Sequence, residues 1–409
     1  MPHSIYRNET PFWLLVLAAG ATVGVCFGIR QAFGLYLAPI SADLGLGRNA
    51  FALSMGLMNL TWGLAAFPVG AIADRYGATR VIVTAALCYM LGIYLMATAR
   101  SESQLVIAGA VLGFGVAGGS FTAVLGAVGR AAAPSRRQMG ITLTGVGGSI
   151  GMFAAMPYAH WLIASVGWQE SLMVLAATAG LMAIFALAFV SAPTAGSMPG
   201  AQSMGAALRE AMAHPGFVLL TLGFFVCGFH VAFVSVHLPA FLKDKAFDAW
   251  LGAGALAAIG LGNILGSLLC GKAGELIEKR LALSLLYFGR AILFLVFIYM
   301  PLSEVTVLVL SFALGILWLG TVPLTSGLIM TLFGPTWMSM LFGITFLAHQ
   351  IGSFLGAWLG GFLYDVFKSY DAMWWISILL GIGAALINLP IRERPVARLS
   401  LDAVGSGQT

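Results

Sequence analysis

The stretch Gly20–Ile40 reads GATVGVCFGIRQAFGLYLAPI and carries one charge, Arg30, inside an otherwise apolar run. With the upstream residues from Trp13 it is long enough to cross a bilayer, which takes roughly 20 apolar residues in a helix. A guanidinium inside a membrane span is costly and is normally retained for a polar pathway or a partner. The sequence therefore marks Arg30 as a candidate functional residue.

The same pattern returns 200 residues later in the chain. The recurring residues are Gly28, Ala32, Phe33 and Pro39, which reappear as Gly228, Ala232, Phe233 and Pro239. His230 stands at the position that corresponds to Arg30. We expect two related helices that each present a basic side chain at the same depth, with two half-proteins holding this pair around a central site.

Composition indicates a membrane protein with many spans. The chain is 60% hydrophobic and 9% charged, with a mean hydropathy of +0.96, whereas about a quarter of the residues in a soluble domain are charged. The four cysteines lie in apolar runs without metal-ligand spacing, and no nucleophile–base arrangement is visible. We therefore expect no enzyme activity, no metal and no cofactor. The basic residues lie in short loops, so we expect membrane lipid and no nucleic acid as a partner.

Twelve apolar runs have the length of a membrane helix. They lie near residues 12–38, 50–72, 79–99, 104–128, 140–163, 170–191, 217–242, 251–274, 281–301, 305–331, 340–363 and 372–390. We expect the first run to stay as a span rather than to act as a cleaved signal peptide. The prediction is an all-α membrane protein with two six-helix halves, 1–191 and 217–398. A cytoplasmic linker, 192–216, contains a short helix near 204–213, and 399–409 is a disordered tail.

The distribution of Lys and Arg predicts the orientation. With the N-terminus inside, cytoplasmic segments hold thirteen of the twenty Lys and Arg residues, outer loops hold five, and Arg30 and Arg290 lie in spans. Positive loops stay on the cytoplasmic side. We therefore predict a plasma membrane protein, in bacteria an inner membrane protein, with both termini cytoplasmic, and we expect it to function as a monomer.

The loop between the second and third runs, Gly70 to Arg80, reads GAIADRYGATR. It resembles the loop signature of the major facilitator superfamily, G-x-x-x-D-R-x-G-x-x-R, and the resemblance covers nearly the whole chain. It implies a major facilitator fold, in which two pseudo-symmetric six-helix bundles work by alternating access. It also implies that Asp74, Arg75 and Arg80 form a conformational gate rather than a substrate site.

A narrower resemblance covers Cys26–Tyr36, CFGIRQAFGLY. This segment is similar to the first helix of monocarboxylate transporters, whose basic residue falls on Arg30. Their eighth helix has an acid–arginine pair where this chain has Asn263 and Ser267, so that part of the pattern is missing. Oxalate/formate exchangers have a basic residue in the eleventh helix, where this chain offers His349.

The acidic residues predict which ligand the spans accept. All of them fall in loops or at span ends, whereas five basic residues lie at membrane depth: Arg30, Arg290, His230, His237 and His349. Cation and multidrug exporters generally need a buried carboxylate. A positive interior favours an anion, and the planar fork of arginine suits a carboxylate. The sequence therefore predicts secondary transport of a small organic anion, a monocarboxylate.

The polar residues in the spans supply the candidate site. We predict substrate contacts from Arg30, His230, His349, Gln350, Asn59 and Asn263. Each of these has a structural alternative, because buried polar side chains also join helices. Arg290 is expected to bond structurally to neighbouring helices, or to belong to the site, and His237 to line it.

The sequence allows three ways in which anion transport could be coupled. Histidine titrates near neutral pH, so His230 or His349 could carry a proton in anion symport. Exchange of two anions without a proton, and movement of the proton on the substrate carboxyl, are the alternatives. The rival functions are a drug or cation exporter and a membrane receptor or channel of this fold.

Overall fold

The computed structural model describes residues 11–131, 134–190, 203–334 and 337–398, and within these ranges the chain forms helices and no strand. The first half contains α1 (Phe12–Ala32), η1 (Phe33–Tyr36), α2 (Leu37–Leu44), α3 (Arg48–Tyr76), α4 (Ala78–Thr98), α5 (Glu102–Gly119), α6 (Phe121–Ala131), α7 (Pro134–Phe185) and η2 (Ala186–Phe189). The rest contains α8 (Met204–Ala213), α9 (Pro215–Asp244), α10 (Ala249–Leu276), α11 (Lys279–Tyr299), α12 (Glu304–Ile316), α13 (Thr321–Phe333), α14 (Met338–Phe367) and α15 (Asp371–Asn388). The predicted tail, 399–409, and residues 191–202 of the linker region lie outside the described ranges.

The number of membrane crossings agrees with the sequence. Eleven segments of the described chain are long and apolar enough to span a membrane, and one of them, Met139–Phe189, has the length of two spans. Within it Gly167 has φ 84° and ψ 171°, so the helix breaks there. Only glycine adopts such a conformation at little cost. Counting this segment as two crossings gives twelve spans, as predicted.

Two spans are broken at corresponding places in the two halves. The fourth span is interrupted at Ser120, which has an extended backbone between α5 and α6. The tenth is interrupted between Ile316 and Thr321, where α12 ends and α13 begins. Each span starts with a serine N-cap, Ser101 or Ser303. Apolar patterning predicted both spans as continuous runs, because residues in a break remain as apolar as their neighbours.

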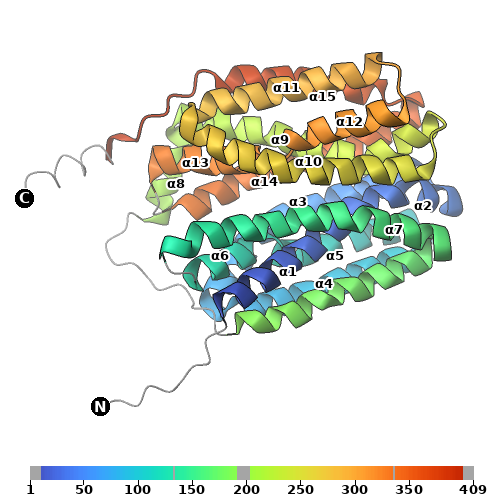
Figure 1. Ribbon diagram of the computed structural model, residues 1–409, viewed down its shortest axis with the longest axis horizontal. Coiled ribbons are helices and arrows are strands. Elements are labelled where there is room, and N and C mark those ends of the chain that lie inside the picture. The colour runs from blue at the N-terminus through green and yellow to red at the C-terminus, as the bar shows by residue number, and fades with distance from the viewer. Residues whose placement is uncertain (1–10, 132–133, 191–202, 335–336, 399–409) are drawn as a thin grey trace, which may run out of the picture.

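The two halves form two layers of helices, α1 to α7 in one and α9 to α15 in the other (Figure 1). Glycines allow close contact inside each layer. A Cβ added at Gly28 of α1 would meet the carbonyl oxygen of Gly151 in α7 at 2.6 Å, and Gly228 of α9 lies against the carbonyl of His349 in α14. Between the layers, α3 packs against α14 and α7 packs against α10. Gln350 lies at the contact of α3 with α14, and Asn263 lies at the contact of α7 with α10.

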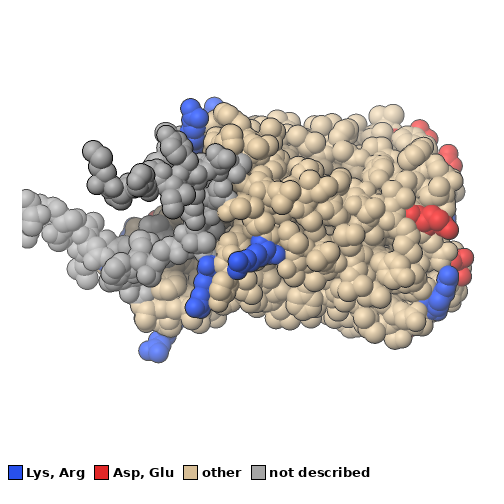
Figure 2. Space-filling view, turned by 90° about the horizontal axis from the view of Figure 1, so that it is seen from below, with Lys and Arg blue, Asp and Glu red and all other residues tan. Residues whose placement is uncertain are grey.

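Charge separates the two ends of the bundle. The terminal end holds the start of α1, the α3–α4 turn and α8, and the opposite end holds the α2–α3 turn and the α9–α10 turn (Figure 1). On the face that Figure 2 shows, Lys and Arg gather toward the terminal end and Asp and Glu gather at the opposite end. The predicted orientation rests on this uneven distribution of Lys and Arg between the two ends.

Candidate functional site

Arg30 is anchored to the third helix and retains free donors. It lies half-buried in the last turn of α1, and its Nη2 donates a hydrogen bond of 2.8 Å to Asn59 Oδ1. The guanidinium carbon lies 5.0 Å from the ring centre of Trp62, and Nε is buried without a hydrogen-bond partner. Among the described residues no carboxylate lies within ion-pair distance of Arg30. The guanidinium can therefore still bind an anion.

The partners of Arg30 are held in place by their own hydrogen bonds. Asn59 donates its amide N–H to the carbonyl of Met55 one turn earlier, at 2.9 Å, so its oxygen faces the arginine. Trp62 Nε1 donates to Ser120 Oγ at 3.2 Å, in the break of the fourth span. The arginine therefore meets one fixed acceptor and one aromatic face, which suits a cation–π contact.

The eleventh span packs Gln350 against α3 and His349 against Phe224 of α9, with 4.7 Å between the ring centres of His349 and Phe224. Phe346 of α14 lies 5.1 Å from Trp62, centre to centre, and stacks on His349 at 5.7 Å. A Cβ added at Gly63 would lie 2.6 Å from the Gln350 Cβ, so Gln350 packs directly against α3. Both amide atoms of Gln350 are buried without a partner. Gln350 thus lies against α3, the helix that carries Asn59 and Trp62, and His349 reaches this helix only through Phe346.

Asn263 and Arg290 lie at the break in the tenth span. Asn263 Oδ1 accepts the backbone N–H of Leu319 at 3.1 Å, and its Nδ2 donates to Ser149 Oγ of α7 at 3.0 Å. Arg290 donates from Nε and Nη2 to the carbonyl of Leu317 at 2.8 and 2.6 Å, and from Nη2 to that of Trp318. The guanidinium thus binds backbone carbonyls that the break leaves without helical partners.

His230 and His237 make their described contacts within the second half. His230 Nε2 lies 2.8 Å from the carbonyl of Ser377, and the ring packs edge-on against Phe294. His237 pairs both ring nitrogens, Nδ1 with the Tyr370 hydroxyl at 3.0 Å and Nε2 with the carbonyl of Ala357 at 2.7 Å. The structure therefore places Arg30 with Asn59 and Trp62, and it places His230 among α11 and α15.

The opposite end of the bundle is joined across the two halves. Arg48 pairs with Asp244 through two bonds, Nη1 to Oδ2 at 2.7 Å and Nη2 to Oδ1 at 2.6 Å. The carboxylate of Asp365 accepts the backbone N–H groups of Arg48 and Asn49 at 3.1 and 2.9 Å, and so caps α3 from the other half. We call these residues the Arg48 latch. Sequence reasoning counted Arg48 only for orientation and missed this contact.

The predicted gate lies at the terminal end. Arg75 and Arg80 are exposed, and neither forms an ion pair with a described residue. Gly77, between them, has φ 94° and makes the turn between α3 and α4. The side chain of Asp74 lies outside the described residues. Of the described acidic side chains, none is buried, in agreement with the acid-free spans that the sequence predicted.

Comparison with known proteins identifies the family. The family model of the Major Facilitator Superfamily matches residues 12–357. This chain belongs to the major facilitator superfamily. Its fold is similar to that of the nucleoside transporter NupG, with a TM-score of 0.74 at 14% identity, over 92% of this chain and 99% of that one. As a superfamily member the chain is a multi-pass membrane transporter and not an enzyme.

Two relatives in this superfamily carry names that include a substrate. Monocarboxylate transporter 13 of Rattus norvegicus is 27% identical over 402 residues, which cover 94% of this chain and 91% of the relative. The 3-(3-hydroxy-phenyl)propionate transporter of Escherichia coli (strain K12) is 26% identical over 285 residues, 66% of this chain and 68% of the relative. The resemblance to monocarboxylate transporters that the Arg30 segment suggested is confirmed at this level of similarity.

Proposed function

We propose that this transporter moves a small organic anion, a monocarboxylate, and that Arg30 binds the carboxylate. The observation that carries the proposal is the guanidinium of Arg30, which has Asn59 as its hydrogen-bond acceptor, a buried Nε without a partner, and no described carboxylate nearby. A planar guanidinium binds a carboxylate through two parallel bonds. A substrate carboxylate would accept hydrogen bonds from the Arg30 N–H groups for which the described protein residues offer no acceptor.

The surroundings of Arg30 favour an anion over a cation. No described acidic side chain is buried, whereas a drug or cation exporter needs a carboxylate for its substrate or its proton. The names of both relatives describe carboxylates as cargo. Gln350 has unpaired amide atoms, which suit a second polar contact to the substrate. In this proposal Asn59 positions Arg30, and Asn263 and Arg290 hold the break in the tenth span.

The proposed mechanism is alternating access with proton coupling through His349. His349 is buried and stacks on Phe346, and its Nδ1 lies 3.5 Å from Ser353 Oγ. The Arg48 latch closes the opposite end. With the orientation that the Lys and Arg residues predict, this end would face outward, and the Arg48 latch would then hold a state closed to the outside. In this proposal Asp74, Arg75 and Arg80 form the conformational gate, and they make their contacts when the terminal end closes.

The test is uptake of labelled carboxylates into proteoliposomes, with and without an inward proton gradient. We expect gradient-driven uptake of one acid by the wild type. Loss of two charge-assisted hydrogen bonds costs about 3 kcal/mol, so Arg30→Gln should lower uptake more than about 100-fold. Arg30→Lys keeps the positive charge but loses the planar guanidinium. Its uptake rate should lie between those of the wild type and Arg30→Gln. The control is Arg136→Gln, which removes an exposed arginine at the terminal end.

Each other result selects a different function. Uptake that ignores the gradient but requires internal anion means exchange without a proton. Loss of gradient dependence in His349→Gln, with exchange preserved, would place the proton on His349, whereas a preserved gradient would remove His349 from coupling. If the protein transports a lipophilic cation, and Arg30→Gln transports it as fast as the wild type, the protein is a drug or cation exporter and the anion proposal is wrong.

A further inference from the structure

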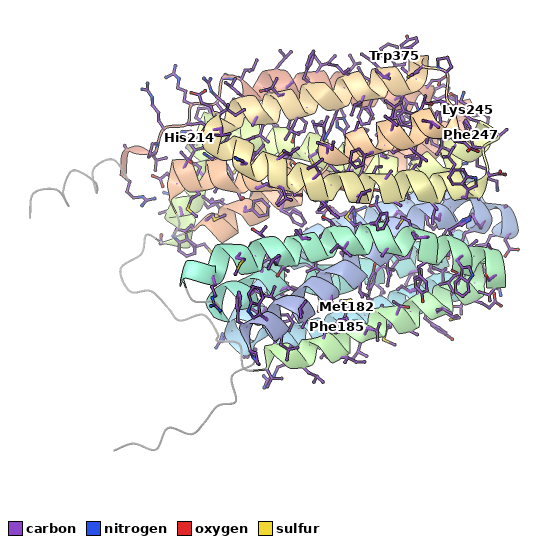
Figure 3. The ribbon with its side chains drawn as sticks, viewed as in Figure 1. Met182, Phe185, His214, Lys245, Phe247 and Trp375 are labelled. Carbon is purple, nitrogen blue, oxygen red and sulfur yellow. The ribbon has the colours of Figure 1, made fainter. Side chains whose placement is uncertain are left out.

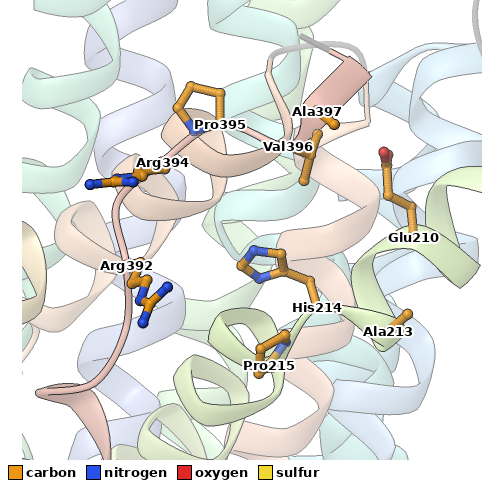
Figure 4. Close-up of a pocket in the computed structure, with 9 residues that line it drawn as sticks. All are labelled: Glu210, Ala213, His214, Pro215, Arg392, Arg394, Pro395, Val396 and Ala397. Atoms are coloured by element: carbon orange, nitrogen blue, oxygen red, sulfur yellow. The ribbon is translucent and has the colours of Figure 1, made fainter. Parts of the chain in front are cut away.

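A pocket of about 450 Å³ lies at the terminal end, away from Arg30. Its walls come from α8, from the start of α9 and from the segment that follows α15 (Figure 4). The lining residues are Glu210, Ala213, His214, Pro215, Arg392, Arg394, Pro395, Val396 and Ala397. None of these residues takes part in the proposed transport site.

The pocket is a fixed part of the fold. The backbone N–H of Val396 donates to the carbonyl of Leu332 at 2.9 Å, and Glu393 accepts the backbone N–H of Arg280 at 2.7 Å. Arg398 Nη2 lies 3.6 Å from the carboxylate of Glu210. The segment after α15 is therefore tied to α11, α13 and α8, and it presents its side chains from a defined position.

The charge of the pocket is positive and unmatched. Arg392 and Arg394 are exposed, and neither has a hydrogen-bond or ion-pair partner in the part of the chain that the structure describes. The acid in the lining, Glu210, has Arg398 as its neighbour. Figure 4 shows Arg392 and His214 on facing walls. His214 Nδ1 is buried without a partner, and burial lowers the pKa of this imidazole although Glu210 raises it.

The backbone adds a second positive contribution. The 30-residue helix α9 starts at the pocket, with Pro215 as its first residue. The first turn of a helix carries partial positive charge and favours an anion. The helix contributes its dipole and no hydrogen-bond donor to the lining, because Pro215 lacks an N–H and the N–H groups of Phe217 and Val218 bond to the carbonyl of His214. The two guanidinium groups and the neutral imidazole around the cavity match the oxygens of a phosphate group.

The helix beside the pocket has an apolar face without a described partner. Met204, Leu208 and Met212 follow each other at intervals of four residues, which places them on one side of α8, and they are 51%, 38% and 53% exposed. Ala207 and Ala211, on another side, are buried. Figure 1 shows α8 at the terminal end of the bundle, beside α13 and α14. A helix with this pattern suits the boundary between headgroups and acyl chains.

We propose that this pocket binds the phosphate group of an anionic phospholipid, with Arg392 and Arg394 on the phosphate oxygens, His214 as a hydrogen-bond partner and the apolar face of α8 in the acyl region. The lipid would join α8, α9 and the segment after α15 at the membrane surface. This site is independent of the proposed carboxylate site.

The experiment titrates phosphatidylglycerol into the full-length protein in neutral detergent and follows the apparent Tm. We expect a saturable rise for the wild type, and none with phosphatidylcholine of the same acyl chains. Arg392→Gln/Arg394→Gln should shift the midpoint about 100-fold, tenfold for each lost charge-assisted contact. Ala213→Trp fills the pocket without changing its charge and should also abolish the rise.

The control, Arg136→Gln/Lys272→Gln, removes two exposed charges outside the pocket and should behave as wild type. Inorganic phosphate is titrated in parallel. If phosphate alone gives the rise, and the pocket variants lose it, the phosphate site stands with a soluble ligand as its source. If the control loses the rise as strongly as the pocket variants, or if Ala213→Trp retains it, the binding is general surface attraction and the proposal is overturned.

Discussion

The two halves differ in how many hydrogen bonds they supply to their buried basic groups. In the first half Arg30 has Asn59 as its acceptor and a buried Nε without a partner. In the second half Arg290 donates three hydrogen bonds to the carbonyls of Leu317 and Trp318, although its Nη1 is buried without a partner, and His237 pairs both of its ring nitrogens. Arg290 is held by three hydrogen bonds to backbone carbonyls, whereas Arg30 makes one hydrogen bond to a described residue and keeps more of its donors for a ligand. The first half therefore supplies the proposed anchor. In the second half Arg290 and His237 bond to the protein itself, and His349 is the proposed proton carrier.

The largest effect on stability should come from Arg290. Arg290→Met keeps the length of the side chain and leaves the carbonyls of Leu317 and Trp318 without donors. Each unsatisfied buried acceptor costs about 1–3 kcal/mol, so we expect a loss of about 3 kcal/mol, seen as a lower apparent Tm in detergent. Arg290→Lys, which keeps one charged nitrogen with N–H donors in place of the guanidinium fork, should lose less. An unchanged Tm with abolished transport would move Arg290 to the substrate site.

His237 should have the next largest effect. His237→Phe preserves the ring and its packing against Phe233 and Tyr370, and it removes the hydrogen bonds to Tyr370 and Ala357. At about 1 kcal/mol for each bond, the free energy of unfolding should fall by about 2 kcal/mol. Transport by the folded fraction, measured per mole of protein in proteoliposomes, should be preserved. A selective loss of transport would contradict a structural role.

His230 should matter less than His237. His230→Phe loses one hydrogen bond, to Ser377, and places an apolar ring against Phe294, so we expect a loss of about 1 kcal/mol. The proton dependence of uptake should stay unchanged, because the described contacts of His230 lie away from Arg30. If the pH profile of uptake moves in this variant, His230 carries the proton and the comparison between the halves fails.

Arg30 should have the smallest effect on stability and the largest on transport. Arg30→Met removes a charge that is costly at membrane depth and loses one hydrogen bond, to Asn59. Replacing a charged group by an apolar one of similar volume is often neutral or stabilising, so the apparent Tm should stay within about 1 °C of the wild type, less than 1 kcal/mol. A fall as large as that of Arg290→Met would make Arg30 structural.

The spans were predictable because burial in lipid requires long apolar runs. The predicted run 217–242 corresponds to α9, Pro215–Asp244, and the short linker helix corresponds to α8, Met204–Ala213. The breaks at Ser120 and after Ile316 were not predicted. Interrupted backbone at membrane depth is stable only where other groups bind its exposed N–H and C=O groups. For the tenth span these groups are Arg290 and Asn263, which come from other helices.

The internal repeat shows where sequence inference ends. Gly28 packs against Gly151 of α7, and Gly228 packs against the carbonyl of His349 in α14, so the fifth and eleventh spans are contacted in the same way. The repeat therefore predicted the placement of the backbone. It did not predict the partners of the side chains: Arg30 reaches Asn59 on α3, whereas His230 reaches Ser377 on α15.

The sequence by itself determined the twelve spans, the two related halves, the acid-free interior and the choice of Arg30 and Asn59, because these follow from hydropathy, spacing and residue chemistry. Only the tertiary structure decided how many hydrogen-bond partners each buried basic group has, and that Arg48 of the first half contacts Asp244 and Asp365 of the second half. The physical reason is that a buried polar group is defined by its hydrogen-bond partners, and here those partners come from helices far apart in the chain.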